Sequence, residues 1–311
     1  MAIPKSVFEV RFGLALIIPT RNRPDLLRRL LANLEEVSLK PETIIIVDSS
    51  DAGKNSELKS KSLNIHQVIT ECRSAAIQRN IGLDYLFDDK MSKGIDFISF
   101  LDDDVLIPSH YFELVLRGFS HDKDCVGLSG IAKTLEPDSI KIRRNWFTDG
   151  IGITGNPGSL TAAAINISPI GLTKLSEVDW LIGCSTWKAN SLQNLRFEPD
   201  FYGQSIFEDV IISARARKLG KLICDPSIIL QHDLATEGRP TTRVHYLNWV
   251  TNRFRIFSYD VPRLSKYKFW LLTILLITKS VLLAPMSTRD RDKFVGLVLG
   301  AKQIMTQRLH K

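Results

Sequence analysis

The sequence is poor in cysteine, and its cysteines are widely spaced. Cys72, Cys125, Cys184 and Cys224 include no Cys-x-x-Cys pair. This pattern excludes a zinc cage built from such pairs and is not typical of a disulfide framework. We therefore expect free thiols, as in a protein of a reducing compartment such as the cytoplasm.

Long hydrophobic runs are also absent. The apolar stretch near the N-terminus is short, ends at Pro19 and follows Glu9 and Arg11, which predicts a first strand rather than a signal peptide. The apolar segment 269–285 falls short of the about 20 residues that span a bilayer. Lys279 also interrupts that segment.

Basic residues flank this apolar segment on both sides, namely Lys266, Lys268, Arg289, Arg291 and Lys293. Basic flanks of this kind are typical of a helix that lies in the membrane interface. Packing within the chain or on a second subunit, and a true span, stay open as alternatives. The C-terminal helical and apolar tail, residues 259–311, makes an anionic membrane surface and a homodimer candidate partners.

A phosphate-binding loop of the Gly-Lys-Ser/Thr type is missing. The glycine-rich stretch 152–159 lacks that ending and follows no clear strand. Otherwise the composition is ordinary for a globular protein, with 44% hydrophobic and 24% charged residues among 311. The formal net charge of +7 favours an anionic partner, which can be a nucleotide, a nucleic acid or an acidic membrane.

Strand and helix patterns alternate through the first hundred residues. Apolar runs of strand length occupy 14–19, 43–50, 64–70 and 97–102, and helical periodicity occurs between them, as in the leucines of 23–37. This order predicts an α/β fold with an open, mostly parallel sheet flanked by helices. In the second half, 207–221 has a helical pattern with Gly220 placed to end it.

Polar clusters follow three of the expected strands, where open α/β sheets bind their ligands. The most unusual cluster is Asp102, Asp103 and Asp104, because adjacent carboxylates repel one another unless positive charge lies among them. A metal ion, an arginine cluster or water are the alternatives. Alternation along a strand would place Asp102 and Asp104 on one side, which favours Mg²⁺ or Mn²⁺ over a solvated strand-to-helix corner.

Three other candidates have simple structural interpretations. Asp48 precedes two serines and forms a good turn. Glu208 and Asp209 suit the N-terminus of a helix, where the dipole favours acids. His232 follows an apolar strand-like run, where a lone histidine is more often structural than a ligand.

Taken in order, these motifs resemble the family 2 glycosyltransferases, nucleotide-sugar enzymes with the GT-A (Rossmann-like) fold. The matching stretches are PTRN, IIIVDSS, QRNIGL, FLDDD, WLIGCSTWKANSLQNLRFEP, FEDVIISARARKLGK and DPSIILQHD. The resemblance covers roughly residues 12–258. It implies a domain 1–258 with a nucleotide-sugar-binding half (1–105) and an acceptor half (106–258), the latter including the loop 133–160.

The resemblance also implies roles for individual residues. Asp209 would be the catalytic base, and Asp104 and His232 would bind Mn²⁺ or Mg²⁺. The residues expected to bind the nucleotide sugar are Pro19, Thr20, Asn22, Asp48, Arg79, Asp102 and Asp103. The residues expected on the acceptor side are Trp180, Gly183, Cys184 and Glu208.

The expected activity is inverting transfer from a nucleotide-diphosphate sugar to a hydroxyl of a saccharide or lipid-linked acceptor. A hexosyl- or rhamnosyltransferase of bacterial surface-polysaccharide assembly, peripheral at the inner face of the membrane, would fit. Asp48-Ser49-Ser50 replaces the family's usual Asp-Gly-Ser, which leaves the identity of the donor's nucleobase open. A sugar nucleotidyltransferase and a non-catalytic nucleic-acid-binding protein are the alternatives; we expect no nucleic acid, because carboxylates cluster at the candidate site.

Overall fold

Two strands that are buried at every position form the centre of the sheet, β1 (Leu14–Thr20) and β2 (Thr43–Asp48). They pair in parallel, as expected for strands covered on both faces. The computed structural model describes residues 12–52, 58, 60, 62–88, 91–134, 144–199, 205–233, 241–283 and 287–308. The remaining strands are β3 (Ile65–Ile69), β4 (Phe97–Phe100), β5 (Val105–Leu106), β6 (Cys125–Thr134), β7 (Ser176–Glu177), β8 (Ser185–Lys188) and β9 (Lys221–His232).

The sheet order is β3-β2-β1-β4-β8-β6-β9-β5, and β7 pairs with β9. Strands β1, β2, β3, β4, β6 and β9 all run in one direction, whereas β5, β7 and β8 run against them. The expected mixed, mostly parallel sheet is thus confirmed.

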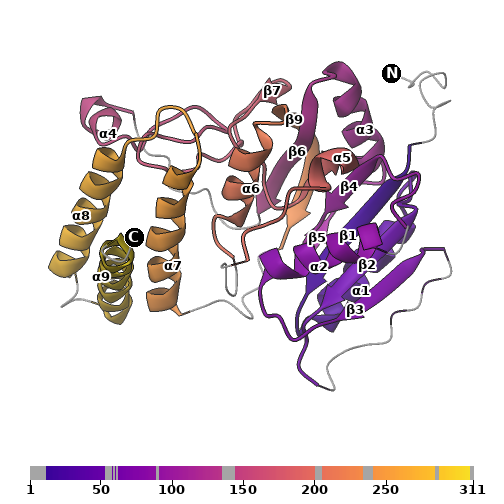
Figure 1. Cartoon of the computed structure of the whole chain (residues 1–311), viewed down its shortest axis with the longest axis horizontal. Coiled ribbons are helices and arrows are strands. Elements are labelled where there is room, and N and C mark those ends of the chain that lie inside the picture. Colours follow the sequence, from indigo (N-terminus) through magenta and orange to yellow (C-terminus); the bar gives the residue numbers. More distant parts are fainter. Residues whose placement is uncertain are drawn as a thin grey trace.

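Helices cover both faces of this sheet (Figure 1). The helices are α1 (Pro24–Glu35), α2 (Ala75–Asp88), α3 (Tyr111–His121), α4 (Trp146–Gly150), α5 (Ala189–Leu192), α6 (Glu208–Ala216), α7 (Thr242–Arg255), α8 (Lys266–Leu283) and α9 (Thr288–Arg308), with a 3₁₀ turn at Ile256–Ser258. Alternate residues of β1 face opposite cores: Ala15 and Ile17 pack with α2 and α6, and Leu14 and Leu16 pack with α1 and α3. The site-bearing helices α2 and α6 therefore share one face.

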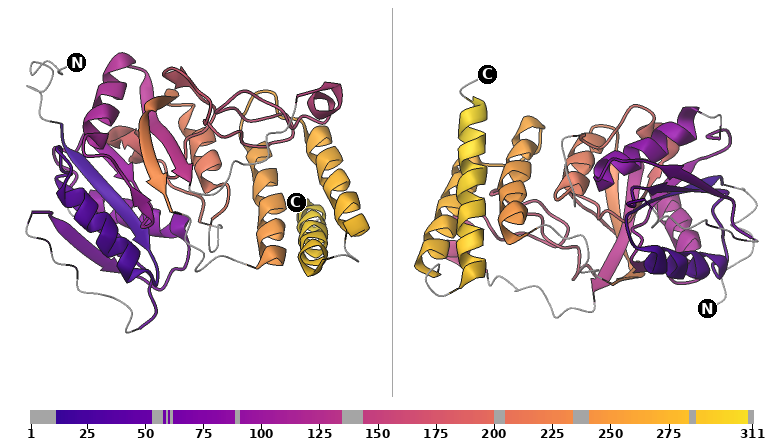
Figure 2. Two further views of the ribbon diagram at one scale, coloured as in Figure 1. Left: turned by 180° about the vertical axis from the view of Figure 1, so that it is seen from behind. Right: turned by 90° about the horizontal axis from the view of Figure 1, so that it is seen from below.

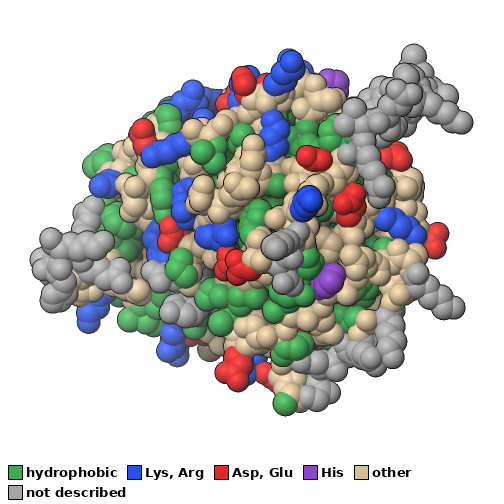
Figure 3. Space-filling view, turned by 45° about the vertical axis from the view of Figure 1, so that its right-hand side comes forward, with side chains coloured by type: hydrophobic (Ala, Val, Ile, Leu, Met, Phe, Trp, Pro, Cys, Tyr) green, Lys and Arg blue, Asp and Glu red, His purple; other side chains and the backbone are tan. Residues whose placement is uncertain are grey.

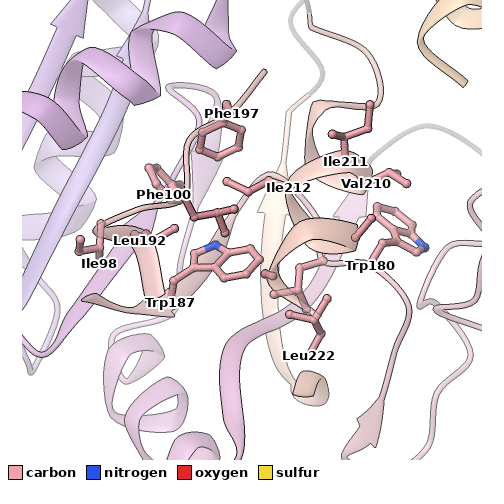
Figure 4. Close-up of a cluster of buried hydrophobic side chains, with 14 of the residues drawn as sticks. Ile98, Phe100, Trp180, Trp187, Leu192, Phe197, Val210, Ile211, Ile212 and Leu222 are labelled. Carbon is pink, nitrogen blue, oxygen red and sulfur yellow. The ribbon is translucent and has the colours of Figure 1, made fainter. Parts of the chain in front are cut away.

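Helix α6 is held by the core on that face. Figure 4 shows Val210, Ile211 and Ile212 of α6 among aromatic side chains that include Trp187 and Phe100. Burial of these side chains fixes the start of α6 against the sheet, so the residues at its N-terminus have a defined position.

The C-terminal helices form a separate layer beyond α6, with α7 between the sheet and the pair α8 and α9 (Figure 2). Val250 of α7, Phe269 of α8, and Leu297 and Ile304 of α9 are buried together. Helix α7 also touches the loop before α6, because the Asn252 side chain donates to the Ile206 carbonyl, 2.9 Å. None of the helices among the described residues combines the length and hydropathy of a membrane-spanning helix.

Some expected boundaries are wrong. The strand expected at 97–102 ends at Phe100, so Asp102–Asp104 lie in a turn and not on a strand. Helix α6 ends at Ala216 rather than near Gly220. A Cβ at Gly220 would lie 2.3 Å from the Asp124 carbonyl oxygen, so glycine permits a close backbone approach there. In the expected acceptor loop 133–160, residues 135–143 lie outside the described part.

Candidate functional site

The carboxyl ends of β1, β2, β4 and β9 meet at one edge of the sheet, because these strands run in the same direction. Thr20 ends β1 and Asp48 ends β2, Asp102–Asp104 follow β4, and His232 ends β9. Residues that are far apart in the sequence are thus brought together where α/β sheets bind ligands.

Asp103 is the most enclosed member of the acidic turn. The Thr20 hydroxyl donates to its Oδ2 at 2.7 Å, and Arg23 Nη1 donates to its Oδ1 at 3.0 Å. Burial nevertheless raises the pKa of Asp103 to about 6, against the lowering effect of Arg23 and Thr20. Asp103 therefore fixes the turn to β1 and α1.

Asp104 lies beside the end of β9. Its Oδ1 is 3.0 Å from His232 Nε2, and its Oδ2 is 3.6 Å from Arg23 Nη1. The register of the sheet explains this contact, since β5 pairs Val105 with His232 and the Asp233 amide donates to the Asp104 carbonyl, 2.9 Å.

Asp102, Asp104 and His232 each offer one ligand atom, and these atoms lie within 4.8 Å of one another. Two carboxylates and an imidazole fit a divalent cation, and the imidazole suits Mn²⁺ better than Mg²⁺. The crowded acids are thus balanced by arginines and form a candidate cation site. The cluster includes both Asp102 and Asp104, the pair that the sequence favoured as cation ligands, although the resemblance implied a sugar-binding role for Asp102.

Arg79 of α2 connects the acidic turn to α6. Its guanidinium is 2% exposed, with Nη2 2.7 Å from Asp102 Oδ1 and Nη1 paired with Glu208 Oε1. The Phe197 ring lies 5.5 Å from the guanidinium carbon. A Cβ at Gly183 would lie 3.3 Å from Arg79 Nη2, so glycine leaves space next to the arginine. Removing one partner of a buried ion pair leaves an uncompensated charge in the interior, which strongly destabilises the fold. The Arg79–Glu208 pair therefore holds α2 in place against α6.

The backbone before α6 has an uncommon conformation. Ser205 and Phe207 have positive φ angles of 52° and 75°, although neither is glycine. The Ser205 hydroxyl accepts from the Ala76 amide at 3.2 Å and lies 3.0 Å from the Ser74 hydroxyl, at the start of α2. Left-handed non-glycine residues cluster at functional sites, where the surrounding contacts hold them in place.

Asp209 and Glu208 have different surroundings although they are neighbours. Glu208 is buried against Arg79, whereas Asp209 is partly exposed and its Oδ1 accepts from the Val210 amide at 2.8 Å. Loss of solvation among the surrounding protein atoms raises the pKa of Asp209 to about 6, the Val210 amide and Arg79 oppose this shift, and Asp102 adds to it. Both acids lie in the first turn of α6, where the helix dipole favours them, as expected. The loss of solvation at Asp209 acts against this effect.

Asp48 and Asn22 lie in the loops beside the acidic turn. Asp48 is buried; its Oδ1 accepts from the Ser50 amide at 2.8 Å and its Oδ2 from Gln67 Nε2 at 3.2 Å, as in the predicted turn. Asn22 follows Pro19 and Thr20 and has a φ of 57°. Its amide exchanges two hydrogen bonds with Asp51, of 2.8 and 2.9 Å, which tie the β1 and β2 loops together.

Two residues expected on the acceptor side lie in the interior. Trp180 packs against Val210, and its indole NH donates to the Ile167 carbonyl, 3.1 Å (Figure 4). Cys184 is buried behind the acidic turn, and burial raises the pKa of its thiol well above the ordinary value. Both side chains therefore support the site from behind.

Arg23 and Gln78 are site residues that the sequence analysis missed. Arg23 precedes the proline that begins α1, and its side chain reaches back to Asp103. Gln78 Nε2 donates to the carbonyls of Thr20, 2.9 Å, and Val47, 2.7 Å, so it holds two strand ends together. An arginine directly before a helix-starting proline was the available signal for Arg23, whereas nothing local distinguishes Gln78.

A model of the glycosyl transferase family 2 matches residues 15–172, which is just over half of the chain. The chain belongs to this family. No curated protein sequence matches it.

Solved structures confirm the GT-A fold of this glycosyltransferase. S. aureus TarS 1-349 in complex with UDP-GlcNAc has 13% identity and a TM-score of 0.55, over 92% of this chain and 79% of that chain. GalNAc-T7 with UDP, GalNAc and Mn²⁺ has 13% identity and a TM-score of 0.58, over 96% of this chain and 58% of that chain. A further structure of S. aureus TarS has 14% identity and a TM-score of 0.51, over 90% of this chain and 45% of that chain.

Proposed function

We propose that this glycosyltransferase inverts the anomeric carbon and moves a sugar from a nucleotide-diphosphate sugar to a hydroxyl of a saccharide or lipid-linked acceptor. A hexosyl- or rhamnosyltransferase of bacterial surface-polysaccharide assembly, at the inner face of the membrane, fits this chemistry. The observation that carries the proposal is the edge where the cluster Asp102, Asp104 and His232 adjoins the N-terminus of α6, which bears Asp209.

Each part of this edge has a separate task in the proposed reaction. A divalent cation held by Asp102, Asp104 and His232 would offset the charge of the departing diphosphate. Arg79 keeps Asp102 in place, and Thr20 and Arg23 do the same for Asp103. Gly183, which we expected on the acceptor side, leaves space beside Arg79 and Asp102.

Asp209 acts as the base in a single displacement at the anomeric carbon. The acceptor hydroxyl oxygen bonds to the anomeric carbon while the bond from that carbon to the diphosphate oxygen breaks. The electron pair leaves with the diphosphate, and the hydroxyl proton moves to the Asp209 carboxylate. Glu208 is unsuited to this step because it is buried in the pair with Arg79.

Thermal denaturation tests the donor class. Nucleoside diphosphates with Mn²⁺ are expected to raise the melting temperature, because a ligand that binds only the folded state stabilises it. The same nucleotides with EDTA should raise it little, since the diphosphate then lacks its counter-charge. A full shift in EDTA, or no shift with any nucleotide and metal, would contradict the proposal.

The rate of transfer should depend on pH through Asp209. A protonated carboxyl cannot accept the hydroxyl proton, so the rate should rise about tenfold per pH unit below the pKa and level off above it. The pKa is raised to about 6 by burial, with Arg79 and Asp102 as the neighbouring charges, so the rate should level off near pH 6. Transfer rates measured at saturating donor over this pH range test the expected rise. Donor affinity measured at each pH is the control. A transfer rate that stays constant over about one pH unit on either side of that pKa would contradict the assignment of Asp209 as the base.

A further inference from the structure

Helix α8 leaves an apolar stripe exposed on the side that faces away from α7 and α9. Tyr267, Ile274 and Val281 recur at intervals of seven residues, and Leu282 adjoins them. Tyr267 is 74% exposed and Ile274 is 57% exposed. At about 1.5 Å per residue, the stripe is about 20 Å long. Continuous exposed apolar surface of this kind marks an interaction site in soluble proteins.

Short helix α4 lies beside the start of α8 and carries two further exposed aromatic side chains. Lys268 Nζ donates to the Asp149 carbonyl, 3.4 Å, and the ribbon views place α4 beside the first turn of α8 (Figures 1 and 2). Trp146 of α4 is 87% exposed, and Phe147 is also exposed. We call Trp146, Phe147, Tyr267, Ile274, Val281 and Leu282 the docking surface.

The charge of the protein is concentrated in the same segment. Residues 259–311 contain ten Lys and Arg and three Asp and Glu, a difference equal to the net charge of +7 of the whole chain. The remainder of the chain is therefore balanced. Figure 3 shows basic and acidic side chains interspersed over one face of the molecule. The exposed Lys266 and Lys279 belong to α8 itself.

We propose that the docking surface binds an anionic lipid bilayer, with α8 lying in the plane of the interface. Exposed Trp and Tyr suit the headgroup level, and flanking lysines bind anionic headgroups while their stems lie along apolar surface. A second copy of the chain fits less well, because two segments that each carry this positive charge would repel. The inference does not depend on which sugar is transferred.

Point substitutions test the surface better than deletion of the tail. Removing residues 266–311 would also remove Phe269, Leu297 and Ile304, which are buried against Val250. Replacing the exposed Ile274 with Asp keeps that core intact. Leu219, which is 56% exposed in the turn after α6, provides the matched control variant Leu219→Asp.

The measurement is co-sedimentation of the full chain with vesicles of phosphatidylglycerol and phosphatidylcholine at low salt. The unsubstituted protein and Leu219→Asp should bind, and added salt should weaken binding because it screens the charges. Ile274→Asp should weaken binding at least about tenfold, because an apolar side chain no longer enters the lipid. Vesicles of phosphatidylcholine alone should bind little.

A second readout separates lipid from protein contact. Brominated lipids should quench the fluorescence of Trp146, and Trp146→Phe should remove most of that quenching. Absence of vesicle binding by the unsubstituted protein, or equal loss in Leu219→Asp, overturns the proposal. A second outcome would also overturn it: the unsubstituted protein forms a dimer in sedimentation velocity, Ile274→Asp dissociates that dimer, and neither protein binds vesicles. The melting temperature of the same variants is also measured with nucleoside diphosphates and Mn²⁺. A normal rise shows that the variants are folded, and it tests donor binding separately from vesicle binding.

Discussion

Replacing Asp209 with Asn is expected to lower the rate of sugar transfer by about 10²- to 10⁴-fold, while donor affinity stays nearly unchanged. An alcohol is a weak nucleophile, and the amide cannot accept its proton. The side chain keeps its shape and its hydrogen bond with the Val210 amide, so the start of α6 should be undisturbed. Initial rates at saturating donor, with calorimetric titration of the donor, measure the two effects.

The stereochemistry of the product tests the same step. One displacement by the activated hydroxyl inverts the anomeric carbon, so NMR of the product should show the configuration opposite to that of the donor. Retention of configuration, or an active Asp209→Asn enzyme, would show that Asp209 only caps the helix.

Glu208→Gln is the contrasting variant for Asp209→Asn. Glu208 contacts Arg79, and Arg79 holds Asp102, so the loss should appear mainly in the KM for the donor. A loss confined to kcat would instead assign the base to Glu208. The neighbouring carboxylates are thus distinguished by kinetics although both lie in the first turn of α6.

Asp104→Ala is expected to abolish the part of donor binding that depends on Mn²⁺. Asp104 is the buried member of the candidate cation cluster and contacts His232 directly. Without its carboxylate, the cation would lose the buried anionic ligand of the cluster, and Asp102 would be the one carboxylate of that cluster left beside His232. Calorimetric titration of a nucleoside diphosphate with Mn²⁺ and with EDTA should then give the same affinity.

Asp233→Ala is the matched control for the metal experiment. Asp233 is the next residue after His232, but its carboxylate pairs with Arg29 at 2.6 Å and is not part of the cluster. Its contact with Asp104 uses the backbone amide, which alanine keeps. Metal dependence that survives in Asp104→Ala, or is lost equally in Asp233→Ala, would argue against the assigned ligands.

The central sheet could be predicted from the sequence because local patterns determine it. The continuous apolar runs of β1 and β2 and the leucine spacing of α1 require no knowledge of the rest of the chain. The edge at which the candidate residues meet follows from the parallel arrangement alone.

The contacts within the site could not be predicted in the same way. Arg79 and Glu208 are separated by 129 positions, and no pattern near either residue indicates an ion pair. Strand β4 has β8 as its second neighbour in the sheet, and β8 comes much later in the chain. Helix α4 is too short for hydrophobic periodicity to reveal it, so Trp146 and Phe147 stood out only once their exposure was known.

The sheet order places strands from distant parts of the chain side by side. Strand β4 has β8 as its neighbour, and β5 pairs with the end of β9. During synthesis, the first hundred residues therefore emerge with an open strand edge that stays unpaired until Ser185–Lys188 is made. Folding must wait for contacts between distant parts of the chain, which makes it slow compared with that of a helical bundle. The acidic turn is consequently completed only after His232 has left the ribosome.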